Sequence, residues 1–293
     1  SSAEYTLGQD IDIAHETCDI TDYTWSLGYF LTVTGEAEWA DRIERAIFNA
    51  APGAVTANFD AVQYFSSVNQ IVCTGNSDNN TFKRGSTWMA YRPTHETECC
   101  AGNMHRMMPN FASRLWMRGE NEAIVAAMYA PSEISFTVDG SECKITEETY
   151  YPFSGDITFR FTTQETKHFP FVFRIPGWCK NYSVTVNGQP VSIKKGNKGY
   201  ATLKRDWSNG DEVRLSLVMT PTIVEAANDQ GKYVECGPLL MAYPVPASVT
   251  EDTNTYSNMN GKKPGDGFKC WSMTPNGPFN YAIYTDEKTL TLN

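Results

Sequence analysis

A change of hydrophobic periodicity near residue 120 constrains the fold of this 293-residue chain more than any other feature. Before this point, apolar residues recur every three or four positions, which is the spacing of an amphipathic helix. The spacing predicts helices over 13–31, 36–51 and 100–118, with Thr34–Gly35 ending the first helix and Pro52–Gly53 the second. The part of the chain before the change is therefore expected to be helical.

After the change, apolar and polar residues alternate, as in strands with one buried face. Strands are predicted at 123–130, 132–138, 156–163, 170–177, 182–188, 200–207, 212–219 and 233–245. No helical pattern separates the first seven, and Asn187–Gly188 is a hairpin signal, which favours an antiparallel β-sandwich. The fold class is thus α + β and multidomain, with a helical region at 1–119, a sandwich at 120–226 and a further β-rich segment at 227–293.

Composition excludes two classes of partner. The formal net charge is −10 and the pI about 4.9, so the surface repels phosphate backbones and nucleic acid is not expected to bind. No apolar run reaches the roughly 18 residues of a membrane-spanning helix, so no membrane insertion is expected. The sequence does not decide between bacterial periplasm and cytoplasm, and it does not give the oligomeric state.

Two segments of the helical region carry the same kind of side chains. His15-Glu16-Thr17-Cys18 lies at the start of the first predicted helix, and His95-Glu96-Thr97-Glu98-Cys99-Cys100 leads into the third. Zinc favours thiolate, imidazole and carboxylate ligands in a tetrahedron, and side chains at a helix start can turn toward one ion. One carboxylate and three thiolates could therefore bind zinc. Two alternatives stay open, a vicinal pair of buried thiols and two half-cystines.

The other five cysteines lie in stretches predicted as strands or loops. Eight cysteines in a chain of this length are too sparse for a small disulfide scaffold. Each of the five is expected to be a buried small apolar residue or half of a disulfide: Cys73, Cys143, Cys179, Cys236 and Cys270.

The stretch ETCDITDYTWSLGYFLTVTGEAEWADRIERAIFNA begins at Glu16 and joins a Glu-Thr-Cys motif to a second helical motif. This stretch resembles the glutamate–cysteine zinc motif and the following helix of the β-L-arabinofuranosidases of glycoside hydrolase family 127 and their relatives. The family's Cys-Cys pair, followed by Asn, matches Cys99, Cys100 and Asn103. Landmarks of the family's sandwich resemble RIPGW from Arg174, VNGQPV from Val186, the Trp207-x-x-Gly210-Asp211 turn and CGPLLMAYPV from Cys236.

This resemblance implies a fold and an activity. The helical region would be the last part of an (α/α)6 barrel, followed by β-sandwich domains. The enzyme would be a retaining, zinc-dependent glycosidase acting on a plant-type oligosaccharide or glycoside. A chain without the earlier barrel helices is expected to be inactive.

The resemblance also implies roles for individual residues. Glu16, Cys18, Cys99 and Cys100 would bind Zn²⁺, with Cys99 also the nucleophile. Glu4, in Ala3-Glu4-Tyr5, would be the acid/base, although it lies only 12 residues before Glu16, a shorter spacing than the family pattern. Two further residues are candidates for contact with the sugar: His95 and Tyr64.

Two other functions remain alternatives at this point. The chain could be a non-catalytic carbohydrate-binding or structural module in which zinc or a disulfide stabilises the helical part. A zinc hydrolase with a water nucleophile fits less well, because four protein ligands fill a tetrahedron and leave no open position for water.

Overall fold

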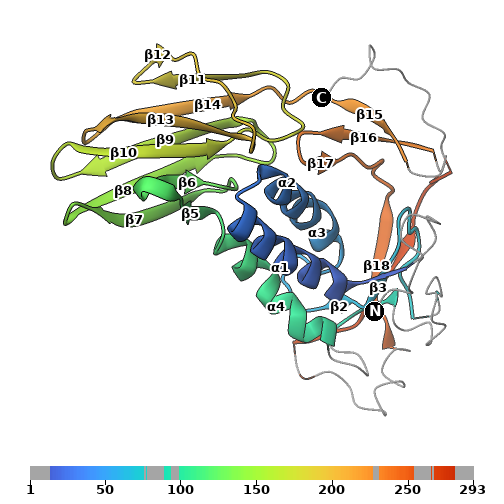
Figure 1. Cartoon of the computed structure of the whole chain (residues 1–293). Helices are drawn as coiled ribbons and strands as arrows, with labels where there is room; N and C mark the ends of the chain where they lie inside the picture. The colour runs from blue at the N-terminus through green and yellow to red at the C-terminus, as the bar shows by residue number, and fades with distance from the viewer. Residues whose placement is uncertain are drawn as a thin grey trace.

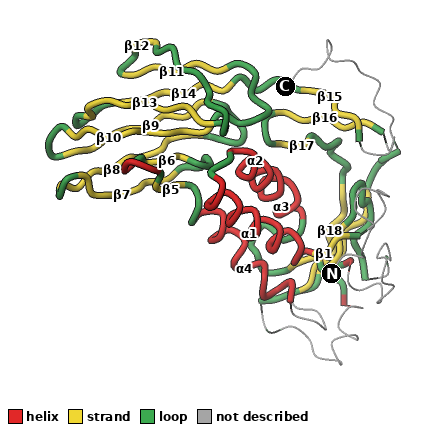
Figure 2. The backbone as a smooth tube through the Cα atoms, in the orientation of Figure 1, coloured by secondary structure: helices red, strands yellow, loops and turns green. Residues whose placement is uncertain are grey.

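Figure 1 shows the computed structural model of the chain, which describes residues 14–75, 77, 89–93, 99–226, 231–253, 265 and 267–280. The described helices pack beside a layered stack of strands, and smaller sheets formed by later segments lie on the other side of the helices (Figure 2). None of the described helices is long and apolar enough to span a membrane.

Helix α1 (Thr17–Thr34) begins and ends at recognisable caps. At its start, the backbone N–H of Glu16 donates to the Asp19 carboxylate over 3.3 Å. At its end, Gly35 adopts φ +64°, and its N–H donates to the Leu31 carbonyl over 2.9 Å. This left-handed conformation costs glycine little, so the predicted end of the helix at Thr34–Gly35 is confirmed.

The second predicted helix is confirmed as one continuous helical stretch. It consists of α2 (Ala37–Arg45), a π-helical segment η1 (Ala46–Ala50) and α3 (Ala51–Gly53). The third predicted helix is too long at its C-terminal end. Helix α4 runs over Cys99–Ala112, and Trp116–Arg118 instead forms strand β5, because it pairs antiparallel with β6 (Ile124–Ala126).

Two sheets form the sandwich and share one aromatic core. The six-stranded sheet has the order β12-β11-β14-β9-β8-β7, and the four-stranded sheet the order β13-β10-β6-β5. All described pairings are antiparallel except that of β10 with β6, which is parallel. Besides β5 and β6, the strands of the two sheets cover these residues: β7 (Ser132–Val138), β8 (Ser141–Thr149), β9 (Asp156–Thr163), β10 (Lys167–Arg174), β11 (Tyr182–Val186), β12 (Gln189–Pro190), β13 (Tyr200–Trp207) and β14 (Glu212–Leu217).

Each of the seven strands predicted for this region overlaps an observed strand, although β10 begins at Lys167 and ends at Arg174, three residues earlier at both ends than predicted. In β9, for example, Ile157, Phe159 and Phe161 face the core, as the alternation indicates. Strand β8 was not predicted. One of the positions of β8 that face the core is Glu147, which is only 2% exposed. A charged residue at an inward position interrupts the alternation of apolar and polar residues in the sequence.

The last part of the chain forms short strands that meet earlier segments. Strands β15 (Thr222–Glu225), β16 (Lys232–Cys236) and β17 (Leu239–Leu240) make a three-stranded sheet, so the single strand predicted at 233–245 is wrong. A two-residue turn at Gly237, with φ +60°, reverses the chain between β16 and β17. A further sheet contains β18 (Ala247–Glu251), β19 (Trp271–Pro275), β4 (Tyr91–Arg92) and β2 (Val62–Gln63).

A buried charged cluster joins the helices to the sandwich. Arg174, at the end of β10, is fully buried and forms ion pairs with Asp41 and Glu44 of α2. Its Nε also donates to the Ala127 carbonyl over 2.7 Å, and the Tyr151 hydroxyl donates to Glu44 over 2.5 Å. Burial raises the pKa of Glu44, while Arg174 acts in the opposite direction. We call Asp41, Glu44, Tyr151 and Arg174 the Arg174 cluster.

Candidate metal centre

The N-terminal ends of α1 and α4 bring the predicted ligands together. Glu16 lies in the two-residue strand β1 (His15–Glu16), which pairs with β3 (Phe65–Ser66). Two further bonds hold the start of α1 against this segment: the Thr17 N–H donates to the Tyr64 carbonyl over 3.0 Å, and the Thr17 hydroxyl donates to the Gln63 carbonyl over 2.6 Å. Cys18 then follows in the first turn of α1, and Cys99 and Cys100 open α4.

Glu16, Cys18, Cys99 and Cys100 form one compact donor cluster. One ligand atom from each residue lies within 4.8 Å of all the others. The Cys18 and Cys100 sulfurs are 3.4 Å apart, and Glu16 Oε1 lies 3.1 Å from the Cys99 sulfur and 3.8 Å from the Cys100 sulfur. Three members are buried, and Cys99 alone among the four is half-buried.

This geometry fits a tetrahedral thiolate-rich metal site. With Zn–S bonds of about 2.3 Å, the sulfurs of a regular tetrahedron are about 3.8 Å apart. The contacts of 3.1 to 3.8 Å within the cluster are close to this spacing, so small movements would adjust them to a common ion. Three thiols with one carboxylate are also donors that zinc accepts. The cluster could therefore hold a metal ion, and its chemistry fits zinc.

The contact between the Cys18 and Cys100 thiols shifts their pKa values in opposite directions. A hydrogen bond from Cys100 lowers the pKa of the Cys18 thiol to about 6, although burial acts in the opposite direction. The same contact with Cys18, together with burial, raises the pKa of Cys100. One thiolate at Cys18, stabilised by a neighbouring thiol, is thus the favoured arrangement without an ion, and binding of a divalent cation would release the remaining thiol protons.

Tyr64 lies against the half-buried sulfur. Its hydroxyl is 3.1 Å from the Cys99 sulfur, and its side chain is 4% exposed. Burial, followed by the contact with Cys99, raises the pKa of this phenol, so it stays protonated and can donate to the sulfur. The sequence singled out Tyr64 as a possible sugar contact; its position beside Cys99, across 35 residues of sequence, has no signal in the residue spacing.

The remaining predicted residues have different outcomes. Glu4 and His95 lie outside the described residues, so their roles stay predictions. All eight cysteines are free thiols, which contradicts the alternative of half-cystines for the pair and for the other five. Cys143, Cys179, Cys236 and Cys270 are buried and Cys73 is half-buried, as expected of small apolar residues.

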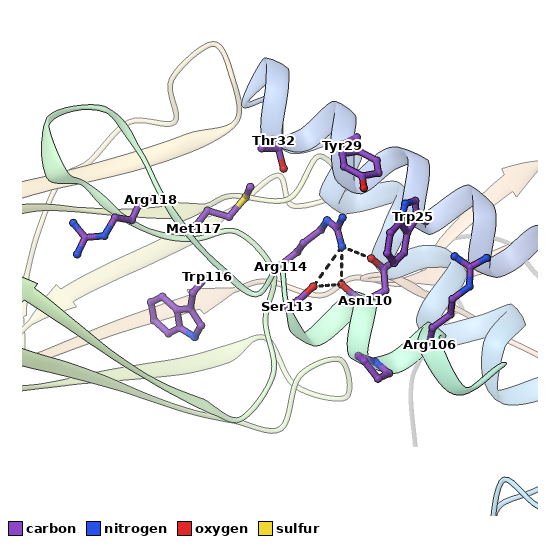
Figure 3. Close-up of a pocket in the computed structure, with 11 residues that line it drawn as sticks. Trp25, Tyr29, Thr32, Arg106, Asn110, Ser113, Arg114, Trp116, Met117 and Arg118 are labelled. Atoms are coloured by element: carbon purple, nitrogen blue, oxygen red, sulfur yellow. Dashed lines mark hydrogen bonds between the residues drawn. The ribbon is translucent and has the colours of Figure 1, made fainter. Parts of the chain in front are cut away.

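A separate groove lies beside α1, α4 and β5. It has a volume of about 610 Å³ and is lined by residues of α1, of α4 and the turn after it, and of β5, as Figure 3 shows. Arg114 lies between the rings of Trp25 and Tyr29, 5.6 Å from each centroid, and bonds to Asn110. A Cβ at Gly28 would meet the Arg114 side chain at 2.2 Å, so this glycine makes room for the guanidinium. None of the four cluster residues lines the groove.

Solved structures that match the fold of this chain include two GH127 enzymes and a protein described as a glycoside hydrolase. The GH127 β-L-arabinofuranosidase Ara127N-Se from Geobacillus stearothermophilus T6 matches with a TM-score of 0.66 and 21% identity, over 89% of this chain and 47% of that one. The GH127 β-arabinofuranosidase BT3674 matches with a TM-score of 0.65 and 23% identity, over 89% of this chain and 42% of that one. A structure described as a glycoside hydrolase gives 0.66 and 24%, over 77% of this chain and 37% of that one.

At these identities the likeness shows the fold, and this chain spans less than half the length of each of these structures. No curated protein matches the sequence. Two models of one family do match it: the GH127 β-L-arabinofuranosidase catalytic domain over residues 2–113 and the GH127 middle domain over residues 123–219. Together they account for well over half of the sequence, and the chain therefore belongs to glycoside hydrolase family 127.

Proposed function

We propose that the chain carries the metal centre of a retaining, zinc-dependent β-L-arabinofuranosidase-like enzyme, with Cys99 as its nucleophile. The observation that carries this proposal is the asymmetry of the donor cluster. Glu16, Cys18 and Cys100 are buried, whereas Cys99 is half-buried, so its sulfur is the one proposed to meet a substrate. Family membership supports a carbohydrate substrate, and a plant-type arabinofuranoside is the proposed one.

The first chemical step would take place at the Cys99 sulfur. Zinc, when bound by the cluster, supplies a means of holding thiols as thiolates at neutral pH without a general base. Cys99 Sγ attacks the anomeric carbon, a C–S bond forms, and the glycosidic C–O bond breaks as Glu4 protonates the leaving oxygen. The Tyr64 hydroxyl, 3.1 Å from this sulfur, orients it and donates to it.

The second step would reverse these roles. Water, deprotonated by Glu4, attacks the anomeric carbon of the thioglycoside, and Cys99 leaves as a thiolate. Each displacement inverts the anomeric configuration, so the two together retain it. A sulfur stabilised by Tyr64 and by its neighbours in the cluster is a better leaving group, which favours this second displacement. His95 is proposed to contact a sugar hydroxyl.

The helical region is proposed to be the C-terminal part of an (α/α)6 barrel, with domain boundaries near residues 119 and 226. In this arrangement the donor cluster lies at the N-terminal ends of α1 and α4, where side chains of both helices converge. The rest of a barrel would supply further contacts to the sugar.

Metal analysis and a trapped intermediate together test this proposal. The purified protein should contain about one zinc per chain, and Cys18→Ser and Cys100→Ser should lower this content. Incubation of a full-length version, which contains the whole barrel, with an activated β-L-arabinofuranoside should place a pentosyl group on the tryptic peptide that contains Cys99. Cys236→Ser, which changes a buried thiol in β16, is the matched control and should behave as the unchanged protein. Turnover retained by Cys99→Ser would remove Cys99 as nucleophile.

A further inference from the structure

The Cys18 and Cys100 sulfurs lie close enough for a covalent reaction that the glycosidase chemistry does not use. They are 3.4 Å apart, unbonded, and separated by 82 residues of sequence. Each belongs to the first turn of a helix, α1 for Cys18 and α4 for Cys100, and both side chains are buried. Because a disulfide has an S–S bond of about 2.05 Å, the two sulfurs need to approach by only about 1.4 Å to form one.

The surroundings favour a disulfide between Cys18 and Cys100 over one between the adjacent residues Cys99 and Cys100. The Cys99 sulfur contacts Glu16 Oε1 and the Tyr64 hydroxyl, each at 3.1 Å, on the half-buried side of the cluster. Cys99 and Cys100 are also consecutive residues of a helix, where successive side chains point in different directions. Elsewhere, Cys143 and Cys179 donate to backbone carbonyls of Ser141 and Asn181.

We propose that the donor cluster is a redox switch in which a hydroperoxide oxidises Cys18 and Cys100 to a disulfide when no metal ion is bound. Two S–H bonds break and one S–S bond forms, while the two electrons and two protons reduce one hydrogen peroxide to two waters. The disulfide removes two of the four metal ligands, so the oxidised protein cannot take up the ion until a dithiol reduces it. The regulatory role of this disulfide rests on the proposed zinc function, but the formation of the disulfide does not.

The test uses the whole chain. Zinc is removed with a chelator under reducing conditions, the reductant is withdrawn, and one equivalent of hydrogen peroxide is added. Titration of the unfolded protein should show a loss of two of the eight thiols. A non-reducing tryptic map should contain peptide 1–42, which holds Cys18, linked to peptide 85–106, which holds Cys99 and Cys100. Zinc rebinding, followed with a chromogenic chelator, should be lost and then restored by dithiothreitol.

Variants identify the pair. Cys99→Ser should keep the link between the two peptides, Cys100→Ser and Cys18→Ser should lose it, and Cys236→Ser should leave it unchanged. Zinc-loaded protein should lose the two thiols more slowly than zinc-free protein. A loss of thiols without linked peptides, which indicates a Cys99–Cys100 bond or sulfur oxygenation, would overturn the proposal. A link that forms in a protein with no zinc affinity would instead count against the metal function alone.

Discussion

Replacement of Arg174 by Met should be one of the most damaging single changes outside the donor cluster. Arg174 is fully buried and is the cation that faces both Asp41 and Glu44. Met has similar length and fills most of the space, so the main effect is the loss of charge. Among the residues that the structure describes, Glu44, which is 0% exposed, would keep its bonds from Tyr151 and from the Tyr129 N–H.

The burial of Arg174 and Glu44 determines how much the free energy of unfolding should fall. Removal of one partner from a buried ion pair costs about 3–5 kcal/mol, because the other charge stays buried without compensation. Arg160→Met provides the matched control. Arg160 forms two carboxylate contacts on the sheet surface, but its side chain is 46% exposed, and such pairs contribute about 0–1 kcal/mol.

Urea unfolding at pH 7, followed by tryptophan fluorescence, measures the difference. With slopes of roughly 1–3 kcal/mol per molar urea, Arg174→Met should lower the midpoint by about 1 M or more, and Arg160→Met by far less. The double variant Glu44→Gln/Arg174→Met, which removes the buried charge as well, should recover part of the loss. An Arg174→Met midpoint equal to that of Arg160→Met, or no recovery in the double variant, would refute the reasoning.

Three further changes test other features. Burial raises the pKa of the Glu147 carboxyl above its ordinary value of 4.5, so the folded state binds the carboxyl proton more tightly than the unfolded state does. The free energy of unfolding therefore falls as the pH rises above about 4.5. Glu147→Gln should be more stable than the unchanged protein between pH 5 and 8, as measured by urea unfolding at each pH. In a full-length version that contains the whole barrel, Tyr64→Phe removes a donor to the Cys99 sulfur and should lower kcat/KM roughly 10- to 100-fold with metal content unchanged. An unaltered kcat/KM would exclude this contact from catalysis. Phe161→Ala removes a ring stacked on an indole at 4.0 Å and should cost about 3–5 kcal/mol in the same unfolding assay, with a loss below 1 kcal/mol contradicting the packing.

Local patterns predicted most of the fold, and the exceptions have identifiable causes. Strand β8 escaped prediction because Glu147 takes an inward position, where the Ser132 hydroxyl donates to it, and a charged residue type hides the alternation. Trp116–Arg118 has helical spacing but pairs with β6, so a long-range contact decides its conformation. The apolar run around Gly237 is long enough for one strand, yet the turn there divides it into two.

For the candidate site, the sequence predicted the identity of the donor residues but not the contacts between them. Glu16, Cys18, Cys99 and Cys100 could be selected as donors by residue type, and the family resemblance grouped them. Spacing alone could not decide between a metal site and a disulfide, because the sulfurs of Cys18 and Cys100 meet across 82 residues of sequence. The position of Tyr64 beside Cys99 also depends on a long-range arrangement, in which β1 and β3 pair.

The motifs that carry the family resemblance serve two different purposes in the folded chain. One set, at the starts of α1 and α4, supplies the donor cluster. The other set includes Asp41 and Glu44 in α2 and Arg174 in the RIPGW segment, 133 and 130 residues apart in sequence and joined as buried ion pairs. Since α2 packs against α1, the Arg174 cluster ties the sandwich to a helix that contacts α1, which holds Cys18 and directly follows Glu16. The sandwich is therefore part of the support of the donor cluster, and Arg174→Met should weaken the proposed zinc binding without changing a proposed ligand.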